Sequence, residues 1–257
     1  MELITTLTNG VYKIVFNRPE VYNSFNKSMA LALQQEFDFC AKNDEVRVVV
    51  ITGSGRAFCA GQDLAEVTDP NGPELTTIVR EHYNPIILKI RALEKPVIAA
   101  VNGVAAGAGA NIALACDLTV AQEKASFIQA FSQIGLIPDS GGTYFLPRIV
   151  GVQKALSLMI TGDKISAKEA EELNMIYKCV GEQEFDTYTT EFSEKLAKMP
   201  TRAFGLTKQA VNRSLSNSLE DQLNLEEELQ TKASQTDDFK EGVQAFLEKR
   251  KAKFNGK

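Results

Sequence analysis

The sequence lacks most of the residues from which metal and disulfide sites are built. Among its 257 residues there is one histidine, His82, which excludes a histidine-rich zinc or iron site. The four cysteines, Cys40, Cys59, Cys116 and Cys179, form no C-x-x-C pair and stand mostly among apolar or small residues. This pattern favours buried free thiols in a reducing compartment over disulfides. We therefore expect neither a bound metal nor a disulfide framework.

A long apolar run and an excess of positive charge are also absent. No apolar stretch approaches the roughly 20 residues that a helix needs to cross a bilayer, and residues 1–4 do not open a signal peptide. The formal net charge is −5, whereas nucleic-acid-binding proteins usually have a basic balance. We expect a cytoplasmic protein that binds no membrane and no nucleic acid, although a local basic patch for one anionic ligand stays open.

What the sequence does contain is an alternation of strand and helix patterns. The composition, 44% hydrophobic and 24% charged, is that of a globular protein long enough to bury a large core. Asn9-Gly10 separates the first two apolar runs and predicts a hairpin with a type I′ turn. Strands are predicted at residues 3–7, 11–16, 46–52, 96–101 and 118–121, and helices at residues 27–42, 75–93, 107–116, 202–217, 219–234 and 239–253. This alternation indicates the α/β class, with an α/β core over residues 1–199 and a helical section over residues 200–257.

Two segments rich in glycine and alanine directly follow predicted buried strands. In RAFCAGQDL (residues 56–64), the small Ala60 and Gly61 let a ligand approach the backbone closely. In NGVAAGAGANIALAC (residues 102–116), Gly-Ala-Gly at residues 107–109 should open a helix, whose free N–H groups favour an anionic oxygen. A plain turn in the first segment and tight packing of a helix on a sheet in the second explain the residues equally well. A dinucleotide fingerprint and a G-K-[ST] phosphate loop are both missing.

A third segment, QIGLIPDSGGTYFLPR (residues 133–148), holds the acid Asp139. Apolar neighbours such as Phe131 and Ile137 would partly desolvate this carboxylate, which raises its pKa toward that of a useful base. The alternative is that Asp139 caps a helix over residues 140–149, because aspartate is a favoured N-cap residue. Taken alone, the segment favours the cap.

Four segments in family order resemble the enoyl-CoA hydratase/isomerase superfamily, the crotonases. They are NRPEVYNSFN (residues 17–26), RAFCAGQDL, PVIAAVNGVAAGAGANIALACD (residues 96–117) and GLIPDSGGTYFLPRIVG (residues 135–151), and the similarity runs from Leu3 to about Gly256. The resemblance implies a crotonase-like core of repeated ββα turns, followed by C-terminal helices, and a homotrimer or hexamer. It also implies an acyl-CoA thioester as the substrate, with no cofactor beyond the CoA that the substrate itself carries.

The resemblance also assigns the parts of an active site. By their places in the motifs, the backbone N–H groups of Gln62 and Ala108 form an oxyanion hole. Removing a proton next to a thioester moves negative charge onto the carbonyl oxygen, and two fixed donors stabilise that charge where it forms. The positions that line the CoA and acyl channel are Ser24, Phe25, Ala60, Asp63 and Leu64.

Departures from the family pattern narrow the expected reaction. Hydratases use two glutamates, one to activate water and one to donate a proton, and these positions hold Asn111 and Phe131 here. Neither side chain can do acid–base work, so hydration is not expected. Asp139 stands where hydratases have glycine and resembles the base of certain isomerases or the nucleophile of an aryl-CoA dehalogenase. That dehalogenase also uses a histidine, where this chain has Asn84, and a tryptophan, which it lacks, so we take Asp139 as the base of an isomerase.

Within the family, the combination of CAGQDL, HYNP (residues 82–85), VAAGAGA and AFSQIGLIPDSGGTYFLPR is most similar to isomerases of aerobic phenylacetate breakdown. These convert ring-1,2-epoxyphenylacetyl-CoA to the seven-membered oxepin-CoA and can shift a Δ3 double bond to Δ2. A Δ3,Δ2-enoyl-CoA isomerase of fatty acids would use the same residues with a different acyl pocket. An acyl-CoA-binding subunit without catalytic activity is the alternative from another functional class, and turnover by the purified protein separates it from the enzymes.

Overall fold

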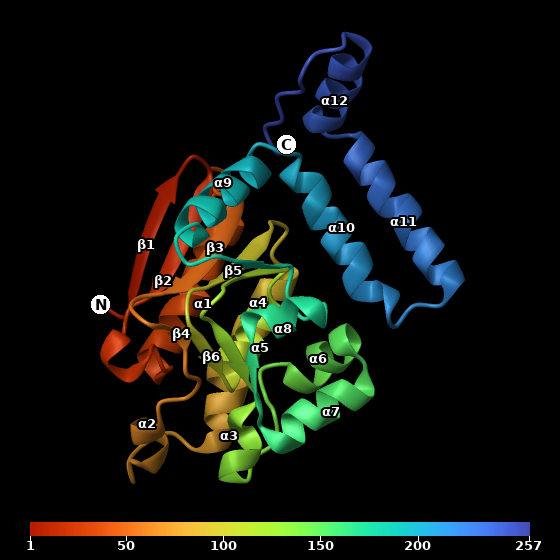
Figure 1. The fold of residues 1–257 in the computed structure, drawn as a ribbon. Helices are drawn as coiled ribbons and strands as arrows, with labels where there is room; N and C mark the ends of the chain where they lie inside the picture. The colour runs from red at the N-terminus through yellow and green to blue at the C-terminus, as the bar shows by residue number, and fades with distance from the viewer.

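Ten strands form two sheets that lie side by side in the α/β part of the molecule (Figure 1). A computed structural model describes all residues of the chain, 1–257. The larger sheet has the strand order β1-β2-β3-β5-β7-β10, and the smaller has β4-β6-β8-β9. The strands of the larger sheet are β1 (Leu3–Thr8), β2 (Val11–Phe16), β3 (Val48–Gly53), β5 (Val97–Val101), β7 (Leu118–Gln122) and β10 (Lys178–Val180). Those of the smaller sheet are β4 (Ala57–Cys59), β6 (Val104–Ala106), β8 (Ser126–Ile128) and β9 (Lys164–Ser166).

Three consecutive ββα turns build this core. In each turn one strand joins the larger sheet, the next joins the smaller sheet, and a helical segment follows. β3, β5 and β7 pair in parallel, and so do β4, β6 and β8. The predicted α/β class is therefore confirmed, with the repeated turns that the family resemblance implies. The helices are α1 (Lys27–Lys42), α2 (Leu64–Thr68), α3 (Leu75–Thr77), α4 (Asn84–Ala92), α5 (Ala108–Ala115), α6 (Gly142–Val150), α7 (Val152–Thr161), α8 (Ala167–Glu172), α9 (Phe185–Ala197), α10 (Thr201–Ser214), α11 (Leu219–Ser234) and α12 (Asp237–Leu247), with the short helical turns η1 (Pro19–Val21), η2 (Ile78–Tyr83) and η3 (Ala130–Ile134).

Elements with a long or strongly marked pattern lie where the sequence predicts them. β1 and β2 pair antiparallel, and Asn9 and Gly10 between them have φ of 52° and 79°, the left-handed values that a type I′ turn requires. α1 spans the predicted residues 27–42, buries its apolar face and is capped by Asn26, whose Oδ1 accepts from the Met29 N–H at 2.9 Å. All four cysteines are free thiols as expected, three of them buried.

Two expectations for the first half of the chain need correction. The smaller sheet was not predicted, because β4, β6 and β8 have three residues each and so show no periodicity. The predicted helix over residues 75–93 is not regular either. It contains α3 and α4 joined by the π-helical segment η2, a form that is rare and often found at functional sites.

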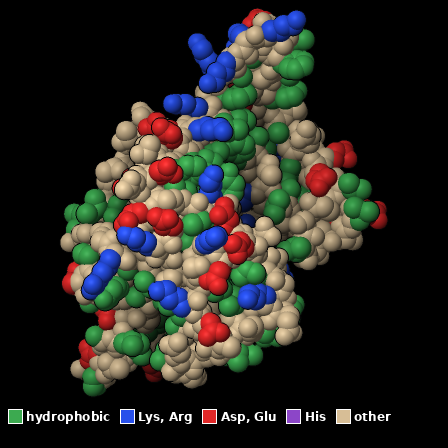
Figure 2. Space-filling model, in the orientation of Figure 1, with side chains coloured by type: hydrophobic (Ala, Val, Ile, Leu, Met, Phe, Trp, Pro, Cys, Tyr) green, Lys and Arg blue, Asp and Glu red, His purple; other side chains and the backbone are tan.

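The last three helices, α10, α11 and α12, project from the body as an arm (Figure 1). One contact between the arm and the core is the ion pair of Lys208 Nζ on α10 with the Asp117 carboxylate, at 2.7 Å. Arg91 on α4 donates to the same carboxylate at 3.1 Å and to Asn212 of the arm. Hydrophobic side chains stand along the arm (Figure 2). The large exposed ones are Val211, Leu215, Leu219, Leu223, Phe239, Val243, Phe246 and Leu247. No helix of the chain has both the length and the hydropathy that a membrane span requires.

Candidate active site

The two glycine-rich segments meet at one edge of the smaller sheet. β4 and β6 are parallel neighbours, with Ala57 opposite Val104 and Cys59 opposite Ala105. The carboxyl ends of parallel strands lie at the same edge, which is where ligands bind in many α/β proteins. Gln62 follows β4 and Ala108 follows β6, so the fold brings together the two predicted oxyanion donors.

Glycine is required where the two segments touch. A Cβ on Gly109 would lie 2.3 Å from the carbonyl oxygen of Cys59. Gly61 has a φ of +94°, and a Cβ there would lie 3.0 Å from the Ala106 oxygen and 3.5 Å from the Ala108 nitrogen. The tight packing considered for these residues is therefore real, and it also sets the first segment directly against the Ala108 nitrogen.

Both predicted donors are backbone N–H groups that this packing leaves without a partner. The neighbours of Gln62 are engaged, since Phe25 N–H donates to the Gly61 oxygen at 2.7 Å and Asp63 N–H donates to the Phe25 oxygen at 2.8 Å. The N–H of Gly107, before Ala108, donates to the Ile128 oxygen at 2.9 Å. The N–H groups of Gln62 and Ala108 themselves donate to no acceptor in the chain. An N–H group without a partner in the chain is open to an external acceptor, so such a pair can bind an oxygen atom of a ligand.

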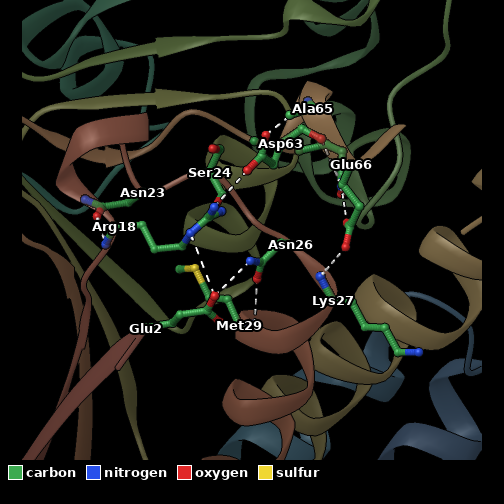
Figure 3. A network of polar contacts seen from close by, with 12 residues as sticks. Glu2, Arg18, Asn23, Ser24, Asn26, Lys27, Met29, Asp63, Ala65 and Glu66 are labelled. Carbon is green, nitrogen blue, oxygen red and sulfur yellow. Dashed lines mark hydrogen bonds and ion pairs between the residues drawn. The ribbon is translucent and has the colours of Figure 1, made fainter. Parts of the chain in front are cut away.

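The side chain of Gln62 is fixed at both ends of its amide. The Tyr83 hydroxyl donates to Gln62 Oε1 at 2.8 Å, and Gln62 Nε2 donates to Glu66 Oε2 at 2.8 Å. Glu66 in turn accepts the Lys27 N–H at 2.9 Å (Figure 3). Burial raises the pKa of Tyr83 well above its ordinary value, so its hydroxyl stays a donor at neutral pH. Sequence reasoning missed Tyr83, although it belongs to the HYNP motif.

The predicted channel residues lie on two loops that are bonded to each other. Ser24 and Phe25 are buried, whereas Ala60 and Leu64 are exposed. Phe25 forms a parallel bridge with Gln62, which joins the loops. Ala60, Asp63 and Leu64 therefore lie close to Gln62 in the sequence, and Phe25 lies beside it on the other loop.

Asp63 has a structural role in this arrangement. Its Oδ2 lies 2.9 Å from Arg18 Nη2, and its Oδ1 accepts the Ala65 N–H at 3.1 Å, which caps α2 (Figure 3). Arg18 also donates to the Ser24 carbonyl at 2.6 Å. Both oxygens of the Asp63 carboxylate are therefore engaged in bonds within the chain.

Asp139 is not a helix cap, which corrects the alternative that its segment favoured. α6 begins at Gly142 with Gly141 at the N-cap position and no side-chain cap bond. Ser140 and Gly141 both have left-handed backbones, with φ of 50° and 76°. They turn the chain so that the helix starts beyond the reach of the carboxylate.

The carboxylate of Asp139 is half-buried and accepts from the Ser140 hydroxyl at Oδ1, at 2.9 Å. Burial raises the pKa of Asp139 above its ordinary value, and the hydrogen bond from Ser140 opposes that rise. A raised pKa makes the ionised group a stronger base, which suits proton abstraction.

The two positions that the family resemblance equates with the glutamates of hydratases are filled by buried, uncharged side chains. Asn111 is fully buried on α5, and its Nδ2 donates to the Asp139 carbonyl at 2.9 Å. Phe131 is also buried, and a Cβ on Gly107 would lie 3.8 Å from its ring. Neither residue can exchange a proton with a water molecule. No group of three or more His, Cys, Asp and Glu side chains is placed to hold a metal ion.

The chain resembles known proteins over almost its whole length. Residues 6–257 match the model of the family described as enoyl-CoA hydratase/isomerase. The 1,2-epoxyphenylacetyl-CoA isomerase of Escherichia coli K12 is 43% identical over 258 residues, which cover 99% of this chain and 98% of that protein. A Rhodobacter capsulatus protein, named a probable enoyl-CoA hydratase, is 44% identical over 251 residues, covering 98% and 96%. The crystal structure of the enoyl-CoA hydratase from Bacillus anthracis has a TM-score of 0.92 at 34% identity and covers 100% of both chains.

Proposed function

The chain belongs to the enoyl-CoA hydratase/isomerase family and has the crotonase fold, and we propose that it is a CoA-thioester isomerase that works through a thioester enolate. The two most similar relatives described above have names that specify CoA thioesters, which supports a CoA thioester as the substrate class. One observation carries the choice of isomerisation over hydration. Asp139 is a half-buried carboxylate with a raised pKa and no cationic partner, whereas both glutamate positions of the hydratases are Asn111 and Phe131.

The proposed reaction needs one base and two donors. The Asp139 carboxylate takes a proton from a carbon conjugated with the thioester carbonyl, and the electron pair of that C–H bond moves onto the carbonyl oxygen. The N–H groups of Gln62 and Ala108 hold this oxygen, where each donor contributes roughly 3–4 kcal/mol to the transition state. Protonated Asp139 then returns the proton to another carbon of the conjugated system, so the product is an isomer and no water is consumed.

For the acyl group we propose the ring-1,2-epoxide of phenylacetyl-CoA. The C1–C2 bond under the epoxide oxygen would break, its electron pair would join the two ring double bonds to give the seven-membered oxepin, and the proton shift would then give oxepin-CoA. A Δ3-to-Δ2 double-bond shift is proposed as a second activity. The support is the 43% identity to an isomerase of that name across nearly the whole of both chains. Epoxyphenylacetyl-CoA and a 3-enoyl-CoA should be assayed side by side. Preference for an aliphatic 3-enoyl-CoA would indicate a fatty-acid isomerase and contradict the proposed acyl group. Turnover of neither substrate would favour an acyl-CoA-binding subunit without catalytic activity.

Hydration provides a sharp test, because a relative with 44% identity carries a hydratase name. We expect this protein to hydrate crotonyl-CoA at least about 100-fold more slowly than a hydratase of the family that has both glutamates, the low end for loss of acid–base catalysis. Both proteins can be measured in the same assay. Efficient hydration by the wild-type protein would contradict the roles assigned at Asn111 and Phe131.

We further propose that the arm, residues 200–257, assembles the chain into a homotrimer or hexamer. Large apolar side chains stand exposed on α10–α12, and a hollow of about 710 Å³ opens between α10 and α11 beside Leu206 and Leu223. Contiguous exposed apolar surface usually marks a protein interface. Light scattering at micromolar concentration should give three or six times the mass of one chain, and a stable monomer would contradict this assembly.

A further inference from the structure

A single buried side chain connects the two halves of the proposed site. Asn111 is fully buried, and its Nδ2 donates to the Asp139 carbonyl oxygen at 2.9 Å. Its Oδ1 accepts from Gln129 Nε2 at 2.8 Å, and Gln129 is buried as well. The amide of Asn111 is thus held in one orientation, with its donor toward the loop of Asp139.

The loop is pressed directly against this amide. A Cβ on Gly142 would lie 2.4 Å from Asn111 Nδ2, so the contact depends on glycine at the start of α6. The Asp139 carbonyl also accepts the Gly142 N–H at 2.8 Å, which closes the turn through Ser140 and Gly141. Asn111 therefore contacts the residues on either side of the two left-handed residues of the turn.

The same helix carries a predicted oxyanion donor. Ala108 is the first residue of α5 and Asn111 is the fourth, and every residue of α5 is buried. One helical turn therefore separates the free Ala108 N–H from the amide that binds the base loop. We propose that Asn111 is a positioning residue that fixes Asp139 relative to the Ala108 donor, with Gln129 orienting its amide, a role that rests on the proposed function of Asp139 as the base.

The chemistry explains why an amide suits this position. Proton abstraction requires the carboxylate and the oxyanion donors to meet the substrate together, and a displacement of about 1 Å can cost roughly 100-fold in rate. The turn stores backbone strain at Ser140, and Asp139 carries a charge that burial disfavours, so the loop needs a contact that holds it inward. An ionised acid at residue 111 has no proton to donate to the Asp139 carbonyl, whereas the amide nitrogen of asparagine carries two.

The test is a double-mutant cycle between residues 111 and 139. Asn111→Leu removes the donor at similar size, and Asn111→Asp is a second variant that keeps the acceptor toward Gln129. Each should lower kcat for 3-enoyl-CoA isomerisation about 10- to 100-fold with KM changed less than about 3-fold. In the Asp139→Asn background the same changes should have little further effect, because they act through the base.

Thr119→Val is the matched control. Thr119 is buried and donates from Oγ1 to the Ala113 carbonyl at 2.9 Å, at the far end of α5. It should lower the thermal midpoint as the Asn111 variants do, while kcat stays near that of the wild type. Equal losses from Asn111→Leu in both backgrounds, or no loss in the wild-type background, would overturn the positioning role alone. An Asp139→Asn variant with full activity would overturn the proposed function as well.

Discussion

Asp139→Asn should lower the isomerisation rate at least about 100-fold, the low end for loss of a general base. Asparagine keeps the size of the side chain and an oxygen that accepts from Ser140, but it cannot take a proton. Binding of the acyl-CoA should change little, because the proposed donors are backbone groups of Gln62 and Ala108 on other loops. Steady-state rates and equilibrium binding of the substrate, measured on both proteins, check the two parts of this expectation.

The same substitution should leave the fold as stable as before or make it more stable. The pKa of Asp139 is raised in the folded chain, so the folded state retains this proton more strongly than the unfolded state. The free energy of unfolding therefore falls as pH rises through that pKa, and at neutral pH the ionised group opposes folding. Asparagine removes this penalty, and thermal unfolding at pH 7 should show no loss. A variant that unfolds early would mean that Asp139 has a structural role.

Ala108→Pro should have an effect of similar or greater size. Proline has no N–H, so the variant loses one donor of the proposed oxyanion hole, a change that typically costs about 100- to 1000-fold in kcat. Ala108 is the first residue of α5, where proline is well tolerated and no intrahelical bond is lost. The close contact of Gly109 with Cys59 lies on the next residue and stays in place. The proline Cδ would stand on the nitrogen that the Gly61 segment packs against, so thermal unfolding of the variant must be measured as well. A variant with the thermal midpoint of the wild type and a lowered kcat isolates the loss of the donor.

The control for this variant is Asp237→Pro, at the first residue of α12 and far along the chain from the site. Both variants should keep their helical circular dichroism, but only Ala108→Pro should lose activity. Wild-type kcat in a folded Ala108→Pro protein would remove the Ala108 N–H from the mechanism.

Local patterns were enough to predict the elements that depend on local interactions. The helical spacing of Met29, Leu33 and Phe37 predicted the bounds of α1, and Asn9-Gly10 predicted the hairpin. Both elements depend on contacts between residues that are close in the sequence. The strands β4, β6 and β8 were missed because three residues carry no period and pair only with strands distant in sequence.

The candidate site shows the same contrast between features that local sequence predicts and features that depend on the fold. Gln62, Ala108 and Asp139 were predicted from motifs of the family that the chain resembles. The interpretation of Asp139 as a helix cap was wrong, because the left-handed backbone of Ser140 cannot be predicted from the residue type. The side-chain bonds that hold these groups were not predicted, although Asn111 itself was named as a departure from the hydratase pattern. The hydrogen bond between Tyr83 and Gln62 joins residues 21 positions apart in the sequence, and that between Asn111 and Asp139 joins residues 28 positions apart. Such bonds exist only after the chain has folded.

Exchange of substrate hydrogen with solvent tests the central claim most directly, because it reports proton removal itself and not the identity of the product. The wild-type protein, incubated in D₂O with an acyl-CoA that has an acidic C–H next to or conjugated with the thioester, should incorporate deuterium at that carbon. Asp139→Asn, folded and still binding the thioester, should not. Exchange by this variant at a rate near that of the wild type would show that another group removes the proton and that Asp139 is not the base.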